Sequence, residues 1–179
     1  MALERQAETK SDYLDGEMFA MTGASLEHNR IAFDVAHALE AQFQSRKCET
    51  FASDMRVRTP SGLFTYPDVV VLCGEPRFDD SETDTLLNPK LIVEVLSKST
   101  AAYDRLTKLP HYQTIPTLAE ILLIAQDRCH VEHRIRQTEG EWLTFEVDDL
   151  GETLELPSLG CSLELIQIYR RVLGQPVEA

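Results

Sequence analysis

The chain has 179 residues, of which 43% are hydrophobic and 26% charged, and its net charge is −13. This composition is that of a folded domain and excludes a disordered chain. No apolar run reaches the roughly 20 residues that span a bilayer, and the first ten residues mix charges where a signal peptide needs an apolar core. We therefore expect a cytoplasmic protein with no membrane partner, forming one domain over 1–179 with its core at about 12–170.

The acidic balance weighs against a nucleic-acid partner, because a negatively charged surface repels phosphates. The charges are unevenly placed, however. Acids concentrate in 75–84 and 139–164, whereas 28–58 and 98–136 hold most of the basic residues. One face of the protein can therefore still be positive, and the net charge does not exclude a nucleic acid.

The four cysteines, Cys48, Cys73, Cys129 and Cys161, are scattered and include no CxxC pair. Zinc sites and disulfide frameworks normally show clustered cysteines. We therefore expect four small thiols in or near the core, without a structural or catalytic role.

The hydrophobic pattern predicts helices and strands in alternation. Asp15-Gly16 predicts the turn of a hairpin over 12–21, and Ser25 predicts the N-cap of a helix that runs to about Gln44. The further expected elements are a strand over 49–58, a turn over 59–62, a buried strand over 66–73, a polar loop over 74–88, a buried strand over 91–96, a helix over 100–113 that Pro110 interrupts or ends, a buried strand over 120–125, strands over 129–137 and 142–148, and a helix over 162–173. This order predicts an α/β (α+β) fold with a mixed β-sheet flanked by helices.

Two acids lie in strands that are too apolar and β-branched to have an exposed face. Asp68 opens the expected strand 66–73, and Glu94 lies inside the expected strand 91–96. Burying an unpaired carboxylate costs several kcal/mol, so such a group needs a partner or takes up a proton. A divalent cation is a suitable partner, because Mg²⁺ binds a few carboxylates together with water and substrate phosphate. If the two strands pair, both carboxylates can reach one metal ion.

A cation near the attacking water would complete such a site. Leu96, two residues after Glu94 on the same strand face, cannot supply a cation. Lys98 continues that face but lies in a turn-like Ser-Lys-Ser-Thr segment at the end of the strand. The strand itself therefore offers no well-placed lysine.

Lys108 is a better candidate for this cation. It falls at helical spacing with Asp104 and Tyr112, so the three side chains share one face of the expected helix 100–113. That face could fold over the ends of the two buried strands. A surface salt bridge between Lys108 and Asp104 explains the spacing equally well, so both interpretations stay open.

Several short motifs follow one another in a specific order. They are Asp15-Gly16-Glu17, Ser25-Leu26-Glu27-His28-Asn29, Ser53-Asp54-Met55-Arg56-Val57, Tyr66-Pro67-Asp68-Val69-Val70, Glu94-Val95-Leu96-Ser97-Lys98-Ser99-Thr100, and Tyr103-Asp104 with Lys108 and Tyr112. In this order and spacing they resemble the PD-(D/E)XK nuclease superfamily and, more narrowly, the Uma-type restriction endonucleases.

The resemblance implies a restriction-endonuclease-like fold and hydrolysis of DNA phosphodiester bonds with Mg²⁺, or alternatively Mn²⁺. Asp68 and Glu94 match the metal-binding acids of the superfamily, and the backbone carbonyl of Val95 would be a third ligand. The superfamily places its lysine two positions after the second acid, where this chain has Leu96; the family generally takes its lysine from the next helix, which points to Lys108. A homodimer is expected by analogy with nucleases that pair subunits to cut two strands.

Four further residues are candidate accessory groups. Glu27 and His28 lie at the start of the first helix, where the helix dipole explains a charged side chain equally well. Lys98 is a second candidate cation, and Gln126 ends the buried strand 120–125.

Two other functions compete with a nuclease. The first is a nuclease-fold protein that no longer cuts and acts as a binding or regulatory module, which Leu96 and the acidic charge favour. The second is a glycosidase that uses the two acids as a general acid/base pair. A glycosidase needs carboxyls about 5–10 Å apart across an open sugar cleft, and the apolar flanks of Asp68 and Glu94 argue against such a cleft.

Overall fold

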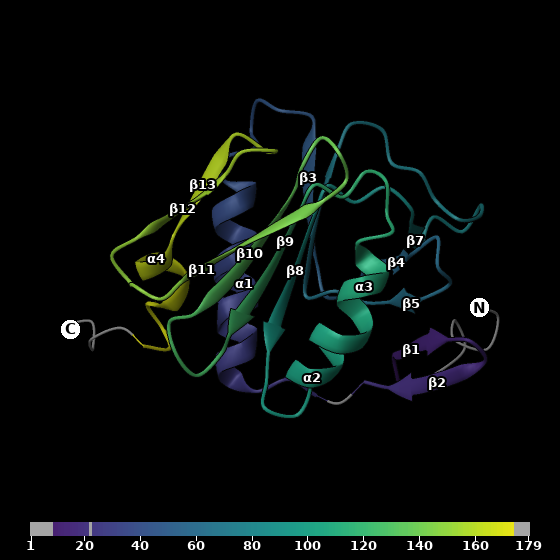
Figure 1. Ribbon diagram of the computed structural model, residues 1–179, viewed down its shortest axis with the longest axis horizontal. Helices are drawn as coiled ribbons and strands as arrows, with labels where there is room; N and C mark the ends of the chain where they lie inside the picture. Colours follow the sequence, from purple (N-terminus) through teal and green to yellow (C-terminus); the bar gives the residue numbers. More distant parts are fainter. Residues whose placement is uncertain (1–8, 22, 174–179) are drawn as a thin grey trace.

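A six-stranded mixed sheet lies at the centre of the computed structural model, which describes residues 9–21 and 23–173 (Figure 1). Its strand order is β11-β10-β9-β8-β6-β3. In chain order these strands are β3 (Cys48–Ala52), β6 (Val69–Cys73), β8 (Leu91–Leu96), β9 (Glu120–Ala125), β10 (Val131–Arg136) and β11 (Trp142–Val147). β8 and β9 pair in parallel, and the other neighbours pair antiparallel. The residues 1–8, 22 and 174–179 of the expected domain lie outside the described residues.

Shorter strands form two smaller sheets beside the central one. The first has the order β2-β1-β5-β4-β7, and the second is the antiparallel pair β12-β13. Their bounds are β1 (Ser11–Leu14), β2 (Glu17–Ala20), β4 (Arg56–Arg58), β5 (Phe64–Thr65), β7 (Thr85–Leu86), β12 (Thr153–Leu156) and β13 (Cys161–Glu164). The fold is therefore a mixed α+β arrangement of several sheets with few helices.

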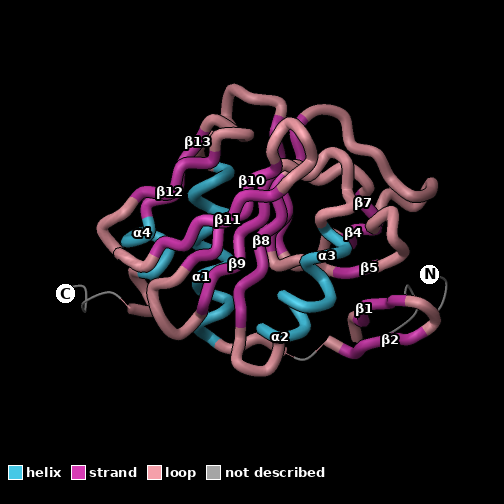
Figure 2. The backbone as a smooth tube through the Cα atoms, viewed as in Figure 1, coloured by secondary structure: helices cyan, strands magenta, loops and turns pink. Residues whose placement is uncertain are grey.

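Helices cover both faces of the central sheet (Figures 1 and 2). They are α1 (Leu26–Glu40), α2 (Ala101–Tyr103), the π-helix η2 (Asp104–Lys108), α3 (Leu109–Tyr112) and α4 (Leu165–Tyr169). α1 and α4 lie on one face, and the α2-η2-α3 segment lies on the other. Among the described residues, no helix has both the length and the apolarity that a membrane crossing requires.

The core consists of two apolar layers, one on each face of the central sheet. Alternate side chains of β6 and β8 enter opposite layers: Val69 and Val93 face α1, whereas Val70 and Ile92 face α3. This alternation follows from the two-residue period of a strand. Because both faces are covered, the central strands read as continuous apolar runs in the sequence.

Several predicted elements are confirmed. The hairpin over 12–21 is β1-β2, and the strands over 91–96 and 120–125 have the predicted bounds as β8 and β9. The N-cap is also confirmed, because the Ser25 hydroxyl accepts a hydrogen bond from the backbone N–H of His28 at 3.1 Å. This helix start places His28 in the first turn of α1.

The single strand predicted over 49–58 is wrong. The segment forms β3 in the central sheet and β4 in the five-stranded sheet. Ser53 lies between them with φ of 55°, and this left-handed conformation ends the extended chain. Its N–H donates to the carbonyl of Asp68 at 2.9 Å. Alternating side chains on both sides of Ser53 concealed this turn in the sequence.

Three other boundaries also differ from the prediction. The strand expected over 66–73 begins only at Val69, and the loop expected over 74–88 contains β7. The helix expected over 162–173 is wrong at its start, where β13 precedes the short α4. There the apolar residues Cys161 and Leu163 alternate as in a strand, and they pair with β12.

The expectation that Pro110 interrupts or ends the helix over 100–113 is wrong, because the helical segment continues through Pro110 to Tyr112. The chain instead widens into the π-helix η2 just before Pro110, and the N–H of Leu109 donates to the carbonyl of Asp104 five residues earlier. A wide turn of this kind relieves the clash between a proline ring and the preceding turn. The last residue of η2 is Lys108, whose side chain is buried.

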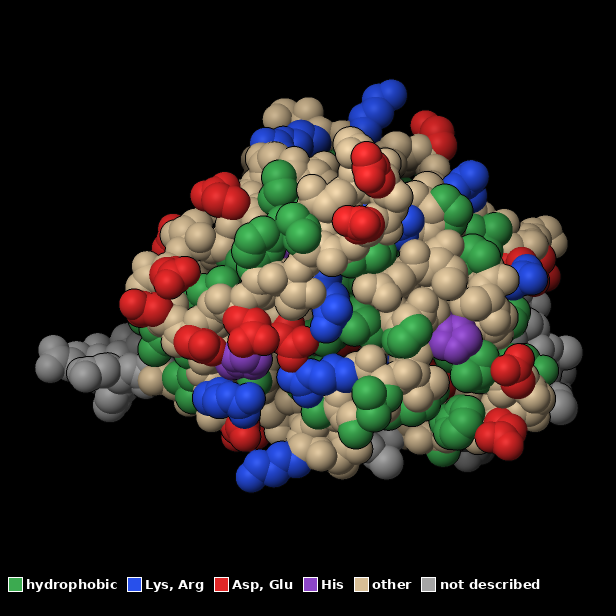
Figure 3. All heavy atoms as spheres, viewed as in Figure 1, with side chains coloured by type: hydrophobic (Ala, Val, Ile, Leu, Met, Phe, Trp, Pro, Cys, Tyr) green, Lys and Arg blue, Asp and Glu red, His purple; other side chains and the backbone are tan. Residues whose placement is uncertain are grey.

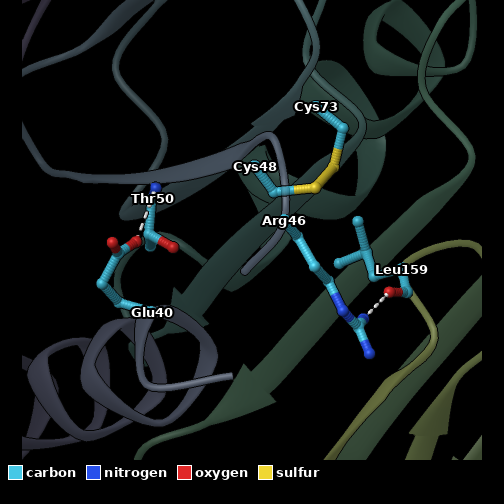
Figure 4. Close-up of a disulfide and its surroundings, with 6 residues drawn as sticks. All are labelled: Glu40, Arg46, Cys48, Thr50, Cys73 and Leu159. Atoms are coloured by element: carbon cyan, nitrogen blue, oxygen red, sulfur yellow. Dashed lines mark hydrogen bonds between the residues drawn. A yellow bond between two sulfur atoms is a disulfide. The ribbon is translucent and has the colours of Figure 1, made fainter. Parts of the chain in front are cut away.

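A disulfide joins the first residue of β3 to the last residue of β6 (Figure 4). It links Cys48 and Cys73, which are also register partners in the β3-β6 pair. The expectation of four free thiols is therefore wrong for these two, because strand pairing brings together cysteines that are 25 residues apart. Cys129 and Cys161 are free.

Reduction of the Cys48–Cys73 disulfide should lower the free energy of unfolding by about 3 kcal/mol, because the bond closes a loop of intermediate length in the unfolded chain. Urea unfolding with and without a reductant measures this difference. A Cys129→Ser/Cys161→Ser variant, which keeps only the bonded pair, should show the same drop. Equal unfolding midpoints in both conditions would contradict the prediction.

Candidate metal centre

Asp68 and Glu94 meet where β6 and β8 lie side by side. In the antiparallel register of these strands Val69 is opposite Val93, so one further step places Asp68 opposite Glu94. Both side chains belong to the face that carries Val70, which is the face covered by α3. The two acids that the sequence singled out are therefore brought together.

Both oxygens of Asp68 are held by neighbours from different elements. The His28 Nε2 lies 2.8 Å from Oδ1, and the backbone N–H of Val95 donates to Oδ2 at 2.7 Å. The carboxylate is still partly open, with 16% of the side chain exposed. Each carboxylate oxygen can accept two hydrogen bonds or ligands, so Asp68 keeps room for a cation.

Glu94 is almost completely buried and accepts two hydrogen bonds on a single oxygen. The Lys108 ammonium lies 3.2 Å from Oε1, and the Tyr112 hydroxyl donates to the same atom at 2.5 Å. Neither donor forms a hydrogen bond with the second oxygen, Oε2. The helix α3 and the π-helix before it therefore fix one side of the carboxylate and leave the other side for a further ligand.

Lys108 is surrounded by acids. Besides Glu94, its ammonium lies 3.4 Å from Oδ1 of Asp104 and 3.7 Å from Oδ2 of Asp12. All four of these residues are buried, with at most 5% of each exposed. Asp104 lies one turn earlier in η2, as the helical spacing predicted, whereas Asp12 comes from the hairpin β1-β2.

This setting changes the pKa of Glu94, Lys108 and Tyr112. Burial raises the pKa of Glu94 to about 8, although Lys108 opposes that rise, and Asp68 and Asp104 add to it. Burial alone would lower the pKa of Lys108, but the surrounding carboxylates, Glu94 first, raise it above its usual value. Burial and the nearby Glu94 also raise the pKa of Tyr112. Lys108 and Tyr112 therefore keep their protons and act as donors.

The residues present fit a divalent cation. Four acidic side chains (Asp12, Asp68, Glu94 and Asp104) act on one ammonium, so acidic groups outnumber the cation at this place. Within the part of the chain that the structure describes, no group of three or more His, Cys, Asp or Glu side chains forms a complete metal cage. Two carboxylates are nevertheless what Mg²⁺ commonly takes from a protein, since water and substrate phosphate fill the other positions.

The backbone of Val95 lies on the same edge of β8 as Asp68. Its N–H, rather than its carbonyl, forms the observed contact with Asp68. The N–H and C=O of one strand residue point to the same side, so the carbonyl predicted as a ligand also faces this edge.

The accessory candidates have different outcomes. His28 reaches Asp68, whereas Glu27 is exposed and Lys98 is exposed in the turn after β8. The structure therefore does not bring Glu27 or Lys98 to the acids. Gln126 joins two elements beside the site, because its N–H donates to the carbonyl of Leu96 and its side chain lies 3.2 Å from the hydroxyl of Ser25.

Sequence reasoning missed Asp12 and assigned no role to Tyr112. Asp12 precedes a hairpin turn and shows no spacing relation to the other acids, so only the packing of the hairpin reveals it. Tyr112 could have been found, because it shares a helical face with Lys108 and that face was expected to cover the acids.

The fold belongs to the restriction-endonuclease-like class. A protein of Anabaena variabilis, described as "a putative nuclease belonging to DUF820", has a similar structure, with a TM-score of 0.70, 18% identity and coverage of 93% of both chains. Residues 1–167 match the model of the Uma2 family, described as "Putative restriction endonuclease", and the chain belongs to this family.

Two proteins of Synechocystis sp. are also similar. The uncharacterized protein sll1609 is 41% identical and covers 86% of both chains. The uncharacterized protein slr1290 is 35% identical over 93% of this chain and 86% of its own length.

Raising the pH should destabilise the metal-free protein. The pKa of Glu94 is about 8 in the folded protein and 4.5 ordinarily, so between these pH values the folded state binds more protons than the unfolded state. The free energy of unfolding should then fall as the pH rises through this range. Glu94→Gln should remove up to about 1.4 kcal/mol per pH unit from this slope.

Urea unfolding in EDTA at several pH values between 5 and 8 measures the slope. Glu49→Gln, which changes an exposed glutamate on β3, serves as the control and should leave it unchanged. The same slope in wild type and Glu94→Gln would show that Glu94 does not titrate in this range.

Proposed function

We propose that the protein is a metal-dependent endonuclease that hydrolyses DNA phosphodiester bonds, with Mg²⁺ as the ion and Mn²⁺ as a substitute. The contact between Lys108 and Glu94 supports this function most strongly. It supplies from a helix the cation that Leu96 cannot provide on the strand, and Leu96 itself is buried in the core. Leu96 is therefore no longer a reason to favour an inactive nuclease fold.

Asp68 and Glu94 would hold the metal, with the backbone carbonyl of Val95 on the same edge. When bound, a divalent ion activates a water molecule and stabilises the charge that develops on the phosphate. His28 and the N–H of Val95 orient Asp68, while Tyr112 orients Glu94. These contacts fix the carboxylates before a substrate arrives, which is the arrangement that favours electrostatic catalysis.

Lys108 would act as a charged donor rather than as a base. The surrounding carboxylates raise its pKa above the usual value, so the side chain does not release its proton to the solvent near neutral pH. An ammonium held in this way can orient the attacking water and neutralise charge on the phosphate. Removal of the water's proton then falls to a group other than Lys108.

Although the net charge is negative, some parts of the surface can still contact DNA. Acidic and basic side chains are interspersed on the face shown in Figure 3. Local basic side chains can thus contact phosphates, while the remaining charge lowers the long-range attraction and makes binding sensitive to salt.

Incubation of the purified protein with plasmid DNA and Mg²⁺ or Mn²⁺ tests the proposal. Asp68→Asn and Glu94→Gln should lose cleavage, and Lys108→Gln should cleave at least about 100-fold more slowly, since it lacks the charge that faces the phosphate. Lys98→Gln is the matched control, because Lys98 lies outside the site; it should cleave like wild type.

Calorimetric titration with Mg²⁺ separates an enzyme from an inactive binding module. The wild type and Lys108→Gln should bind the ion, and Glu94→Gln should bind it at least about tenfold more weakly. Equal cleavage by the wild type, Asp68→Asn and Glu94→Gln would refute the proposed site. Ion binding by a wild type that cuts no DNA would instead favour a binding module.

A further inference from the structure

The hairpin β1-β2 delivers a buried acid to the candidate metal centre from outside the two main layers. In Figure 1 the hairpin lies beside α2, away from the central sheet. Asp12 is paired with Phe19 in the hairpin register, and only 3% of Asp12 is exposed whereas all of β2 is exposed. Phe19 packs on Tyr103 with ring centroids 5.6 Å apart. The hairpin is thus anchored to the helical segment that carries Lys108.

Asp12 has an unusual hydrogen-bonding state. Its Oδ2 lies 3.7 Å from the Lys108 ammonium, which is beyond hydrogen-bond distance. Its Oδ1 is buried and has no hydrogen-bond partner in the part of the chain that the structure describes. The carboxylate forms an ion pair with Lys108, and burial together with the nearby Asp12 raises the pKa of Tyr103. The fold retains this acid beside Lys108 although Glu94 and Asp104 already contact the ammonium at shorter distances.

We propose that Asp12 is a positioning residue that holds Lys108 in the site once Glu94 is shared with a metal ion. This inference rests on the proposed function. Lys108 and a metal ion compete for the same carboxylate, so metal binding weakens the attraction of Glu94 for the ammonium. Asp104 lies in the same helical segment as Lys108, whereas Asp12 belongs to the hairpin and contacts the ammonium from a separate element. Asp12 therefore keeps the ammonium directed into the site.

Asp12→Asn tests this role, because it keeps the shape of the side chain and removes its charge. It should lower kcat at least tenfold, since displacing a catalytic group by about 1 Å can cost roughly 100-fold. The KM for DNA and the affinity for Mg²⁺ should change less than the kcat. Asp12→Glu should restore part of the kcat. Asp15→Asn is the matched control in the same hairpin; Asp15 is exposed with φ of 50°, which asparagine also tolerates.

A second readout does not depend on activity. Protein labelled with ¹³C at the lysine side chains reports whether the Lys108 methylene protons are ordered, and Lys108→Gln assigns the signal. In wild type and Asp15→Asn, with Mg²⁺ present, Lys108 should give the shifted signal of an ordered side chain. In Asp12→Asn it should move to the position of exposed lysines.

An unchanged Lys108 signal and unchanged kcat in folded Asp12→Asn protein would overturn the inference. Loss of activity in both Asp12→Asn and Asp12→Glu in proportion to lost thermal stability would also overturn it, because Asp12 would then only support the fold. Absence of both cleavage and Mg²⁺ binding in the wild type would refute the proposed function instead, and the metal-dependent role of Asp12 would fall with it. Mg²⁺ binding by the wild type together with an unchanged Lys108 signal in Asp12→Asn would overturn the inference alone.

Discussion

The burial of one ammonium among several carboxylates is the constraint on which the candidate site depends. Lys108 contacts Glu94 at the centre of the sheet, with Asp104 and Asp12 on its other sides. An isolated buried charge of either sign would be too costly to keep. The lysine makes the buried Glu94 tolerable, and the acids do the same for the lysine. The excess of negative charge that remains is what a divalent cation would neutralise.

The rest of the fold determines where Lys108 and the acids around it lie. The central strands β6 and β8 are covered on both faces, so their positions are fixed by packing rather than by the polar groups. The π-helix brings Lys108 inward before Pro110, and α3 adds Tyr112 one turn later. On the other side of the sheet, the capped start of α1 supplies His28 to Asp68. The Cys48–Cys73 disulfide lies at the opposite end of β6 from Asp68, and it stabilises the scaffold rather than the site.

Much of this could be predicted from the sequence, for identifiable reasons. Glu94 was detectable because a carboxylate inside an apolar strand is costly to bury and needs a partner. Lys108 was detectable because it falls at helical spacing with Asp104 and Tyr112. Asp12 was not detectable, since the docking of a hairpin on a distant helix leaves no periodic signal. The break at Ser53 and the pairing of Cys48 with Cys73 were missed for the same reason: both depend on which strands become neighbours. Hydrophobic periodicity in the sequence thus predicts the helices and strands, whereas contacts between distant segments determine which residues join the metal site.

Manganese bound in crystals of the protein tests the central claim most directly, because the ion can be located by its anomalous scattering independently of activity. One anomalous peak should be shared by the carboxylates of Asp68 and Glu94, at roughly the 2.0–2.2 Å typical of a small divalent ion. The Lys108 ammonium should stay beside this peak. An empty space between these two acids at saturating manganese, with Lys108 still bound to Glu94 as its full counterion, would contradict the proposed metal site.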